Sequence, residues 1–478
     1  MNTIDTGFVY PNYNPPQHLL DALRDLSAND SWKTHQYPIF RGELRLRRAI
    51  TKLNEPLVKR HIDADREVLV TVGAIQALDL AAKSYVSPGD DPRFFHRSNK
   101  TADIFNGKEA DTFLEIEMLS HQYKSLSFAS NYPNYMPSKH MMQAFRSVAQ
   151  NETTYAIHHL GSCRGDPRLR AAIAYLYSIL MKRPIHADKE IAVTTGAMQA
   201  LYLLAKAYIN AGDEVIMFEP FFKRLEIIIK ISGGIPVFVP LNTVSGQKAR
   251  QSNDLTFNRK ELEAAFTNRT KMIWLVNPNN PTGKIFTEEE LLFIGELCKK
   301  HDVIILSDEV YQFHTFEGPK HTRIATLPGL WSRTVTVNSG GKIFSSTGWR
   351  IGWIIGPEEL LWGVYIGMNA LVRAPPTPTQ MAFAIGLEME NKILNTDESY
   401  YQSLVKYTIA KRDRMLKILS DAGIDFVKPN SGQVVMANFT NVINKIDLST
   451  ESDQKADFRL MNWLMKHKQK IVTLFSIS

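Results

Sequence analysis

Cysteine is scarce in this sequence: the 478 residues include only Cys163 and Cys298, which lie far apart and match no metal-ligand spacing. This scarcity excludes a disulfide framework and fits a reducing compartment, and we expect no metal site. Long apolar runs are absent too, because none approaches the ~20 residues of a membrane-spanning helix, so we expect no membrane partner. The first residues contain neither an apolar signal core nor an arginine-rich presequence, which favours the cytoplasm over the mitochondrion.

A strong charge of one sign is also missing. The 56 Lys and Arg residues only slightly outnumber the 49 Asp and Glu residues, and the basic residues are dispersed, usually beside acidic ones. The C-terminal cluster Lys466, Lys468 and Lys470 is typical of a solvated helix end. Because no basic segment is interleaved with aromatic residues, we expect no nucleic-acid partner. The hydrophobic fraction of 44% and the length indicate a globular protein of more than one domain.

One long block of the sequence occurs twice. PNYNPPQHLLDALRDL at 11–26 echoes PNYMPSKHMMQAFRSV at 133–148, and RGELRLRRAI at 41–50 echoes RGDPRLRAAI at 164–173. A third stretch, 70–90, echoes 193–213. The matches lie 122 or 123 residues apart, so this is a single duplication and not a short solenoid repeat.

The two copies continue differently, and this indicates the domain organisation. The second copy runs into a long α/β pattern, whereas the first breaks off into a polar stretch. We predict a partial duplicate at 1–91, a linker at 92–125, the N-terminal part of a small domain at 126–160, a large domain at 161–375 and a C-terminal small domain at 376–478. The first copy either packs on the second or is poorly ordered, and the sequence leaves both open.

Beyond residue 190, short β-branched runs alternate with amphipathic stretches. The pattern predicts strands at 191–196, 214–219, 235–241, 271–277, 303–310 and 333–340, and helices at 197–211 and 288–301. Thr287, followed by three glutamates, predicts a helix N-cap. Such alternation indicates an α/β fold with a mainly parallel sheet, which binds ligands at the carboxyl ends of its strands. Helices at 379–390 and 400–422 and a strand at 431–439 predict a smaller α+β domain.

Two polar motifs follow predicted strands, where a ligand would bind. Gly196, in Thr-Gly-Ala-Met, turns a strand into a helix whose first N–H groups suit an anion, although a plain tight turn fits about as well. NPNNPTGK at 277–284 is a rigid polar loop. It either holds Asn280 ready to hydrogen-bond a ligand or is simply a turn.

Two further motifs carry ionisable groups. Asp308, in SDEVYQ, directly follows an apolar strand, where a carboxylate is costly unless a cation such as a protonated pyridine nitrogen lies beside it. Lys342 lies in SGGKIFSSTGWRIGW, where a lysine among small residues can act as an imine-forming nucleophile, and Arg350 nearby suits a phosphate. A lone loop lysine is usually a surface charge, but the four motifs in this order outweigh that interpretation.

From about Leu126 onward the chain resembles the class I and II aminotransferases of fold type I, whose cofactor is pyridoxal 5′-phosphate. EPFF, NPNNPTGK, SDEVYQ and SGGKIFSSTGWRIGW carry the resemblance. Within the family it is greatest to the group of kynurenine aminotransferases, glutamine transaminase K and cysteine-conjugate β-lyases. The resemblance implies a three-layer α/β fold with a mainly parallel central sheet and a smaller α+β domain, assembled as a homodimer.

The resemblance also implies a role for each motif residue. Lys342 would be the Schiff-base lysine and proton carrier, and Asp308 would keep the pyridine nitrogen protonated. Asn280 and Tyr311 would hydrogen-bond the phenolic oxygen, and Phe222 of EPFF would stack on the ring. The residues that would bind the phosphate are Gly196, Ala197, Met198, Ser339 and Arg350.

The sequence departs from the family pattern mainly on the substrate side. The pattern has a C-terminal arginine that grips the substrate carboxylate, whereas no arginine follows Arg459 here. Asn131 stands where the pattern has a glycine near the substrate entrance, and we assign Asn131 and Asn280 to the substrate. A family tyrosine that reaches the phosphate of the partner subunit is matched by Tyr37 in the first copy, but by Leu160 in the second.

Several functional hypotheses follow. The leading one is a transaminase that moves an amino group from an L-amino acid (kynurenine, glutamine-like, aromatic or sulfur-containing) to a 2-oxo acid by a ping-pong Schiff-base mechanism, with Arg373 from a partner subunit as a substitute anchor. A second is β-elimination on cysteine conjugates. A third is a cofactor-binding homologue of low or no activity, because a lost arginine–carboxylate contact would weaken substrate binding about a hundredfold. A fourth is a scaffold whose interface is the duplicated block.

Overall fold

The structure is a computed structural model of the chain, and it describes residues 13–38, 41–85, 119–120, 122–127, 133–151, 154–243, 247–451, 455–468 and 470–471. Packing divides the chain into two units. Unit 1 comprises 1–37, 133–207 and 335–402. Unit 2 comprises 38–132, 208–334 and 403–478. The predicted linker at 92–125 falls almost wholly outside the described residues.

The strands of unit 1 are β2 (Ile191–Thr195), β9 (Ile351–Ile355) and β8 (Thr334–Ser339), which neighbour one another in that order. Both pairings are antiparallel, with Val193 opposite Trp353 and Asn338 also opposite Trp353. Every residue of the three strands is buried, including the polar residues of β8, so both faces of this part of the sheet are covered.

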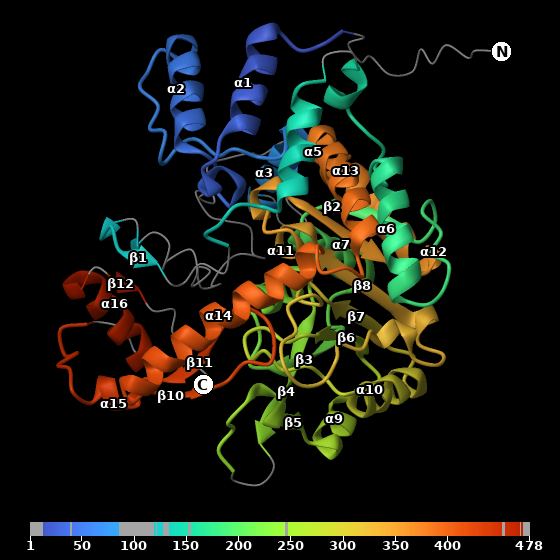
Figure 1. Ribbon diagram of the computed structural model, residues 1–478, viewed down its shortest axis with the longest axis vertical. Coiled ribbons are helices and arrows are strands. Elements are labelled where there is room, and N and C mark those ends of the chain that lie inside the picture. Colours follow the sequence, from blue (N-terminus) through green and yellow to red (C-terminus); the bar gives the residue numbers. More distant parts are fainter. Residues whose placement is uncertain are drawn as a thin grey trace. The chain divides into compact units, whose positions relative to one another are not determined.

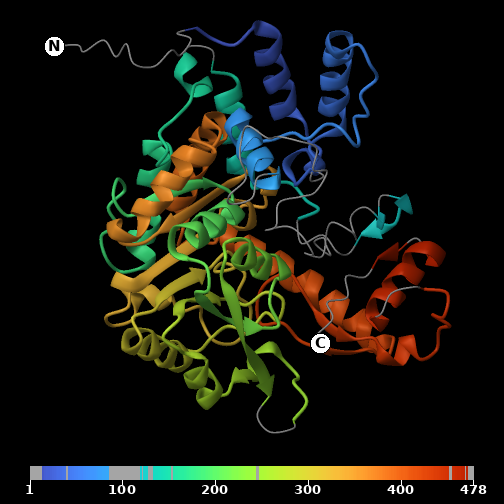
Figure 2. The same ribbon diagram turned by 180° about the vertical axis from the view of Figure 1, so that it is seen from behind.

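The helices of unit 1 cover these strands. In Figures 1 and 2, α13 (Thr377–Ile393) lies between α5 (Lys139–Ala149) and α6 (Pro167–Leu180), and it contacts both. Helix α6 begins at the Asp166 cap, whose carboxylate accepts the N–H groups of Arg168 and Leu169, with Pro167 in the first turn. Helices α7 (Ala197–Tyr208) and α12 (Glu358–Leu371) also belong to this group, and α12 contacts β2.

Unit 2 holds the parallel strands. Their order is β7 (Ile304–Asp308), β6 (Thr270–Val276), β3 (Glu214–Glu219), β4 (Ile235–Thr243) and β5 (Leu255–Phe257). The pairs β7–β6, β6–β3 and β3–β4 are parallel, and the short β5 is antiparallel to β4. The predicted α/β class with a mainly parallel central sheet is confirmed.

Helices α8 (Lys223–Ile231), α9 (Arg259–Ala265) and α10 (Glu288–Lys300) belong to unit 2. The predicted N-cap is present: Thr287 Oγ1 accepts the N–H of Glu290, and the Glu290 carboxylate accepts the N–H of Thr287. The apolar side of α10 joins a buried cluster with Ile273 and Phe286. This cluster fixes the strand end that carries the NPNNPTGK loop.

The C-terminal part of unit 2 has helix α14 (Tyr400–Asp421), the antiparallel strands β10 (Asp425–Val427) and β11 (Met436–Asn438), and helices α15 (Thr440–Ile443) and α16 (Ala456–Lys468). Strand β1 (Leu126–Ser127) pairs in parallel with β12 (Lys470–Ile471). The strand predicted over 431–439 is shorter than expected. Ser431 is instead fixed by its side chain, which donates to the carbonyl of Gly283 at 2.9 Å, and Gly432 has a φ of +79°.

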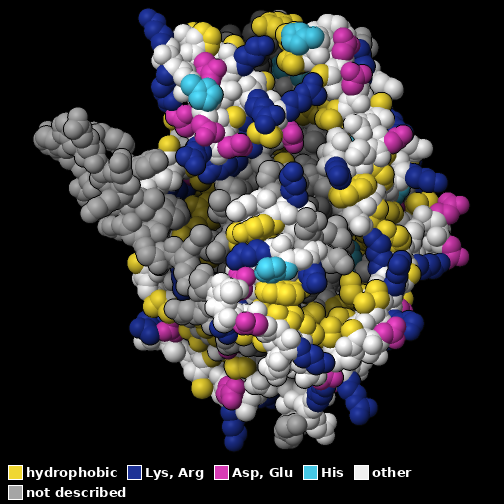
Figure 3. Space-filling view, turned by 90° about the vertical axis from the view of Figure 1, so that its left-hand side faces the viewer, with side chains coloured by type: hydrophobic (Ala, Val, Ile, Leu, Met, Phe, Trp, Pro, Cys, Tyr) yellow, Lys and Arg dark blue, Asp and Glu magenta, His cyan; other side chains and the backbone are white. Residues whose placement is uncertain are grey.

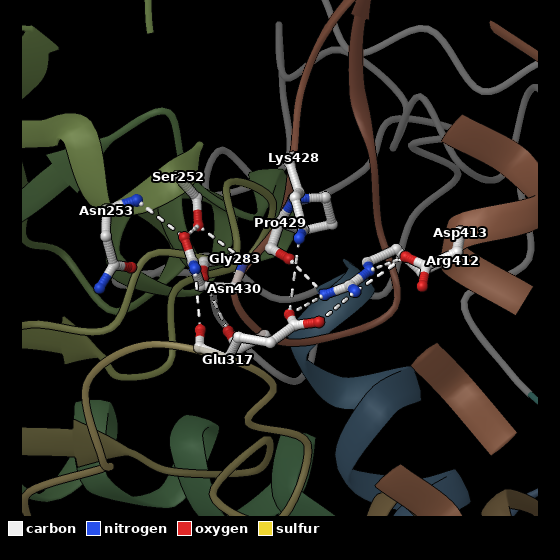
Figure 4. A network of polar contacts seen from close by, with 10 residues as sticks. Ser252, Asn253, Gly283, Glu317, Arg412, Asp413, Lys428, Pro429 and Asn430 are labelled. Carbon is white, nitrogen blue, oxygen red and sulfur yellow. Dashed lines mark hydrogen bonds and ion pairs between the residues drawn. The ribbon is translucent and has the colours of Figure 1, made fainter. Parts of the chain in front are cut away.

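A polar network secures the segment before β11 (Figure 4). Asn430 accepts the hydroxyl of Ser252 at 3.0 Å and donates to the carbonyl of Glu317 at 2.9 Å. Arg412 of α14 faces the Glu317 carboxylate with both terminal nitrogens, at 2.6 and 2.8 Å. The Arg412 guanidinium lowers the pKa of the Glu317 carboxyl to about 2. Segments far apart in the sequence are thus joined within unit 2.

The two copies of the duplicated block have the same local structure. In the first copy, Arg47 donates to the carbonyls of Gly42 and Ala64, at 3.0 and 2.5 Å. In the second, the equivalent Arg170 donates to the carbonyls of Gly165 and Ala187, at 3.2 and 2.9 Å. The elements correspond too: α1 (Gln17–Ala28), η1 (Trp32–His35), α2 (Leu44–Val58) and α3 (Gly73–Tyr85) match α5, η2 (Tyr155–His158), α6 and α7.

Charged side chains are mixed on the surface. On the face shown in Figure 3, Lys and Arg side chains lie among Asp and Glu side chains and do not gather into one patch. Several oppositely charged side chains form ion pairs, for example Arg60 with Glu67 at 2.8 Å and Arg24 with Asp21 at 2.6 Å. None of the helices that the structure describes combines the length and the apolar character that crossing a membrane requires.

Candidate cofactor site

The turn between β2 and α7 has features that suit an anion. Gly196 has a φ of +75°, which glycine adopts without steric cost. The Thr194 hydroxyl donates to the Gly196 carbonyl at 3.0 Å, and Gln199 accepts the Thr195 N–H at 2.6 Å, so side chains hold the turn. Helix α7 starts at Ala197, followed by Met198, and its first N–H groups have no acceptor within the helix.

Arg350 lies on the same turn. Its Nη2 donates to the carbonyl of Thr195 at 3.4 Å, and its Nη1 donates to the carbonyl of Thr347 at 3.2 Å. A Cβ on Gly196 would collide with the guanidinium, so glycine is needed for this close approach. The structure therefore brings two of the predicted phosphate residues, Gly196 and Arg350, into direct contact. Together they offer a positive charge and free helix N–H groups to one anion.

Lys342 lies on the loop that leads to Arg350. It belongs to the short helix α11 (Gly340–Ile343), which follows β8 directly, and its side chain is half-buried. Ser339, the last residue of β8, is buried and is the N-cap of α11. A Cβ on Gly341 would lie 2.7 Å from the Cα of Thr347, so α11 packs tightly against the residues before Arg350. Lys342, Ser339 and Arg350 thus share one packed loop of unit 1.

In unit 2, Asp308 and Tyr311 lie at the carboxyl end of β7. The Asp308 side chain is only 6% exposed, and its Oδ1 accepts the N–H of Val310 at 3.3 Å. Tyr311 is also buried, and its ring meets His314 edge to face with centroids 5.5 Å apart. A carboxylate this buried is stabilised only by hydrogen bonds and positive charge, which is typical of functional sites.

Glu309 fixes the turn that carries Asp308. The sequence did not single out this residue. It is fully buried; its Oε1 accepts the Ser307 hydroxyl at 2.9 Å, and its Oε2 lies 3.1 Å from His321 Nε2 and 3.7 Å from Arg323 Nε. Burial lowers the pKa of the His321 imidazole. The only sequence signal for Glu309 was a second acidic residue directly after the strand.

The NPNNPTGK loop is rigid in the structure. Asn277 accepts the N–H of Phe286 at 3.1 Å, and its own N–H donates to the carbonyl of Asp308 at 3.0 Å. Asn279 accepts the Thr282 hydroxyl at 2.7 Å. These contacts place the loop beside the end of β7. Asn280, the predicted ligand residue, is half-buried within the loop.

Phe222 and Asn131 complete the predicted set. Phe222 caps α8, is half-buried, and has the Arg224 guanidinium 5.9 Å from its ring centroid. The preceding Phe221 is engaged elsewhere, because it stacks on Phe238 at 4.9 Å. Asn131, which we assigned to the substrate, lies outside the described residues.

The described residues fit pyridoxal 5′-phosphate, which combines a phosphate, an aldehyde and a pyridine nitrogen. The turn at Gly196 with Arg350 suits the phosphate, and the buried Thr195 hydroxyl beside it has no hydrogen-bond partner within the described chain. Lys342 suits the aldehyde, and the buried Asp308 suits a protonated nitrogen. No cluster of three or more metal-ligating side chains occurs over the ranges that the structure covers.

Comparison with known proteins defines the family. The model of aminotransferase class I and II matches residues 123–472. Kynurenine–oxoglutarate transaminase 3 of Homo sapiens is 34% identical over 366 residues, covering 76% of this chain and 79% of that protein. Kynurenine–oxoglutarate transaminase of Dictyostelium discoideum is 37% identical over 342 residues, covering 69% and 76%.

Solved structures agree. Bna3p of Saccharomyces cerevisiae, a candidate kynurenine aminotransferase, superposes with a TM-score of 0.69 at 29% identity, covering 76% of this chain and 87% of that one. YbdL of Escherichia coli shares the fold, with a TM-score of 0.65 at 23% identity over 77% of this chain and 88% of that one. The fold is that of a fold type I transferase. The chain belongs to the class I and II aminotransferases.

Proposed function

We propose that the chain is a pyridoxal 5′-phosphate-dependent transaminase that moves an amino group from an L-amino acid to a 2-oxo acid. The observation that carries the proposal is the contact of Arg350 with the Gly196 turn, on the loop that begins at Lys342. An anion site next to a half-buried lysine is what a phosphorylated aldehyde requires. The named relatives act on kynurenine and oxoglutarate, and we propose kynurenine or a similar aromatic, sulfur-containing or glutamine-like amino acid as the donor.

Each residue has a defined task in this proposal. The cofactor, when bound, supplies an electron sink for the bonding electrons at the substrate α-carbon. Arg350, Ser339 and the N–H groups of Ala197 and Met198 hold the phosphate. Asp308 keeps a proton on the pyridine nitrogen.

The remaining residues act on the ring and on the substrate. Asn280 and Tyr311 donate hydrogen bonds to the phenolic oxygen, and Phe222 packs on the ring face. Lys342 would hold the cofactor aldehyde through its Nζ, and its amine would serve as the base that accepts the proton of the substrate α-carbon. We also propose that Asn131 and Asn280 contact the substrate, and that the chain works as a homodimer in the cytoplasm; gel filtration that shows only a monomer would contradict the dimer.

The decisive test is spectroscopic. Purified protein with pyridoxal 5′-phosphate should show the absorbance band of the lysine-bound cofactor, and Lys342→Ala should abolish that band. Lys417→Ala, which changes a lysine 75% exposed on α14, is the matched control and should leave the band in place. Addition of kynurenine should then convert the band to that of the aminated cofactor.

Two results would contradict the proposal at different levels. If no band forms in the unchanged protein, the cofactor assignment is wrong. If the band forms but neither kynurenine nor another amino acid alters it, the protein binds the cofactor without transamination.

A further inference from the structure

A segment of the first repeat docks on the loop between Lys342 and Arg350. The buried amide of Gln36 donates to the carbonyl of Ser345 at 2.8 Å and accepts the hydroxyl of Thr347 at 2.8 Å. The backbone N–H of Tyr37 donates to the same Thr347 hydroxyl at 3.2 Å. All these residues belong to unit 1. The docking is specific, because a buried amide is matched at both its donor and its acceptor.

Tyr37 and His35 extend this docking to the C-terminal end of the loop. The Arg350 guanidinium lies 5.0 Å from the Tyr37 ring centroid, in the geometry of a cation–π contact. Trp349 Nε1 donates to His35 Nδ1 at 3.2 Å, and the ring of Phe145 lies 4.9 Å from Trp349. The first repeat therefore contacts Arg350, the arginine beside the Gly196 turn, through the ring of Tyr37.

The first repeat contacts the second repeat through equivalent helices. Helix α1 packs against α5, the helix that corresponds to it in the second copy (Figure 1). Arg146 of α5 donates to the carbonyl of Ser27 at 3.2 Å and pairs with Asp30 at 3.2 Å. In a twofold interface, a surface of one copy contacts the equivalent surface of the other copy. The duplicated chain makes such a contact within itself.

The second copy of the block keeps most of the groups with which the first copy makes these contacts, so a second chain would offer them too. In the aligned sequence the second copy has Ala149 in place of Ser27, with the same carbonyl, and Glu152 in place of Asp30. The hydrogen bond from the Gln36 N–H to the carbonyl of Lys33 recurs as His159 to Ala156, so η1 and η2 correspond and Tyr37 corresponds to Leu160. Leucine cannot make the cation–π contact with Arg350.

We propose that residues 13–37 take the place of a second chain. Within one chain they cover the surface of α5 and of the loop 343–350, and in their absence the equivalent segment of a second copy would cover that surface. Tyr37 is then a positioning residue for Arg350 that only the first repeat can supply. Intact chains that form a dimer would meet through another surface. The docking itself does not depend on the proposed function, since its contacts involve no cofactor.

The first test asks whether the segment docks in its own chain. In the full-length protein, amide hydrogen exchange should show protection of residues 17–37 and 343–350 that does not change between dilute and concentrated solutions. Gln36→Glu places a carboxylate against the carbonyl of Ser345 and should remove this protection, whereas Gly161→Ala should not, because its Cβ meets only Thr377 Oγ1 at 3.6 Å. Protection that rises with concentration, or that survives in Gln36→Glu, would overturn the proposal.

The second test asks whether the segment stands in for a second copy. Gln36→Glu leaves α5 and its loop intact, so sedimentation should show stronger self-association than in the unchanged protein. Adding Gly348→Ala should reverse that gain, because a Cβ at 348 lies 2.5 Å from the docked carbonyl oxygen of residue 36 and would meet the equivalent backbone of a second copy. Unchanged self-association in Gln36→Glu would show that the surface is not one for a second copy.

The third test concerns Tyr37 and rests on the proposed cofactor. Tyr37→Ala should weaken pyridoxal 5′-phosphate binding roughly three- to tenfold in an absorbance titration, while Tyr37→Phe, which keeps the ring, should restore it to within about twofold. Tyr37→Ala added to Arg350→Ala should have no further effect. If the exchange result holds and no variant binds the cofactor, only the proposed function fails; if Tyr37→Ala binds as tightly as the unchanged protein, the role of Tyr37 fails.

Discussion

Arg350 shows how single residues define this site. Its backbone has a φ of +55°, and Ser345 at the start of the same loop has a φ of +57°. Each costs about 1–2 kcal/mol in a non-glycine residue. The loop keeps this conformation because its carbonyl and hydroxyl groups are bonded to Gln36 and because Gly196 leaves room for the guanidinium. Local strain offset by surrounding contacts is typical of a ligand-binding turn.

Gly196→Ala should disable the anion site. The new Cβ would meet the Arg350 guanidinium, and alanine at a φ of +75° is itself strained. Loss of one charge-assisted contact of about 1.5–3 kcal/mol corresponds to a rise of roughly 10- to 150-fold in the dissociation constant for pyridoxal 5′-phosphate. An absorbance titration measures it, with Gly161→Ala as the control. Equal affinities of the two variants would place the phosphate elsewhere.

His35 should make the docking of the first repeat sensitive to acid. Burial, together with the nearby Arg146 charge, lowers the pKa of the docked imidazole, whereas the undocked side chain has its usual pKa of about 6.5. The docked form therefore binds fewer protons. Docking is fully stable above pH ~6.5 and weakens as the pH falls below that value towards the lowered pKa of the docked form.

Hydrogen exchange of residues 17–37, corrected for its intrinsic pH dependence, measures this effect. His35→Gln removes the titrating group and should flatten the profile, even if it weakens docking at every pH. A profile in the unchanged protein that is as flat as in His35→Gln would rule out His35 as the sensor.

At the scale of elements, the sequence patterns predicted strands β2, β3, β4, β6, β7 and β8 and helices α7, α10, α13 and α14. Helix α14 ends at Asp421, one residue before the predicted end, and β3 has the predicted bounds. Strand β9 was not predicted, because its first three residues are the end of the Lys342 motif itself. The strand is also buried on both faces, so it shows no alternation. The strand predicted over 431–439 was too long, because Ser431 and Asn430 are held by side chains distant in the sequence, which no local pattern reveals.

Thr287→Ala should destabilise unit 2 through α10. It removes one half of a capping box and leaves the N–H of Glu290 without its acceptor. Such changes cost about 0.5–2 kcal/mol. Chemical unfolding measures the loss, and Thr287→Ser, which keeps the hydroxyl, should recover most of it. A Thr287→Ala protein as stable as the unchanged one would mean that solvent satisfies this helix end equally well.

At the scale of the whole molecule, the duplication and the fold class could be read from the sequence, but the docking of the first repeat could not. Gln36 and Ser345 are 309 residues apart, and Gln36 belongs to none of the four motifs. The residues of the candidate site were predicted because their motifs follow predicted strands. The contact between Arg350 and Tyr37, in contrast, depends on how the copies pack, which one copy of the block does not encode.

The two copies should differ in what they stabilise, and Arg47 and Arg170 provide a matched pair. They are 1% and 5% exposed, and each pairs with an aspartate, Asp65 or Asp188, besides bonding to carbonyls. Replacement by methionine leaves these acceptors unsatisfied in either copy, at a cost of about 1–3 kcal/mol. The local loss of stability should therefore be similar in Arg47→Met and Arg170→Met.

Their effects on the cofactor should diverge. Arg170 lies in α6, which contacts β2 and so supports the Gly196 turn where Arg350 lies. The equivalent turn of the first copy has Gly73 at a φ of +78°, yet a Cβ there meets no atom of the described residues within 4 Å, so no arginine in the described ranges approaches it. Arg170→Met should thus weaken pyridoxal 5′-phosphate binding, and Arg47→Met should leave it within about twofold, the spread expected for a distant site. If Arg47→Met weakened binding as much as Arg170→Met does, the first copy would contribute to the cofactor site beyond residue 37, and the division of tasks between the copies would be wrong.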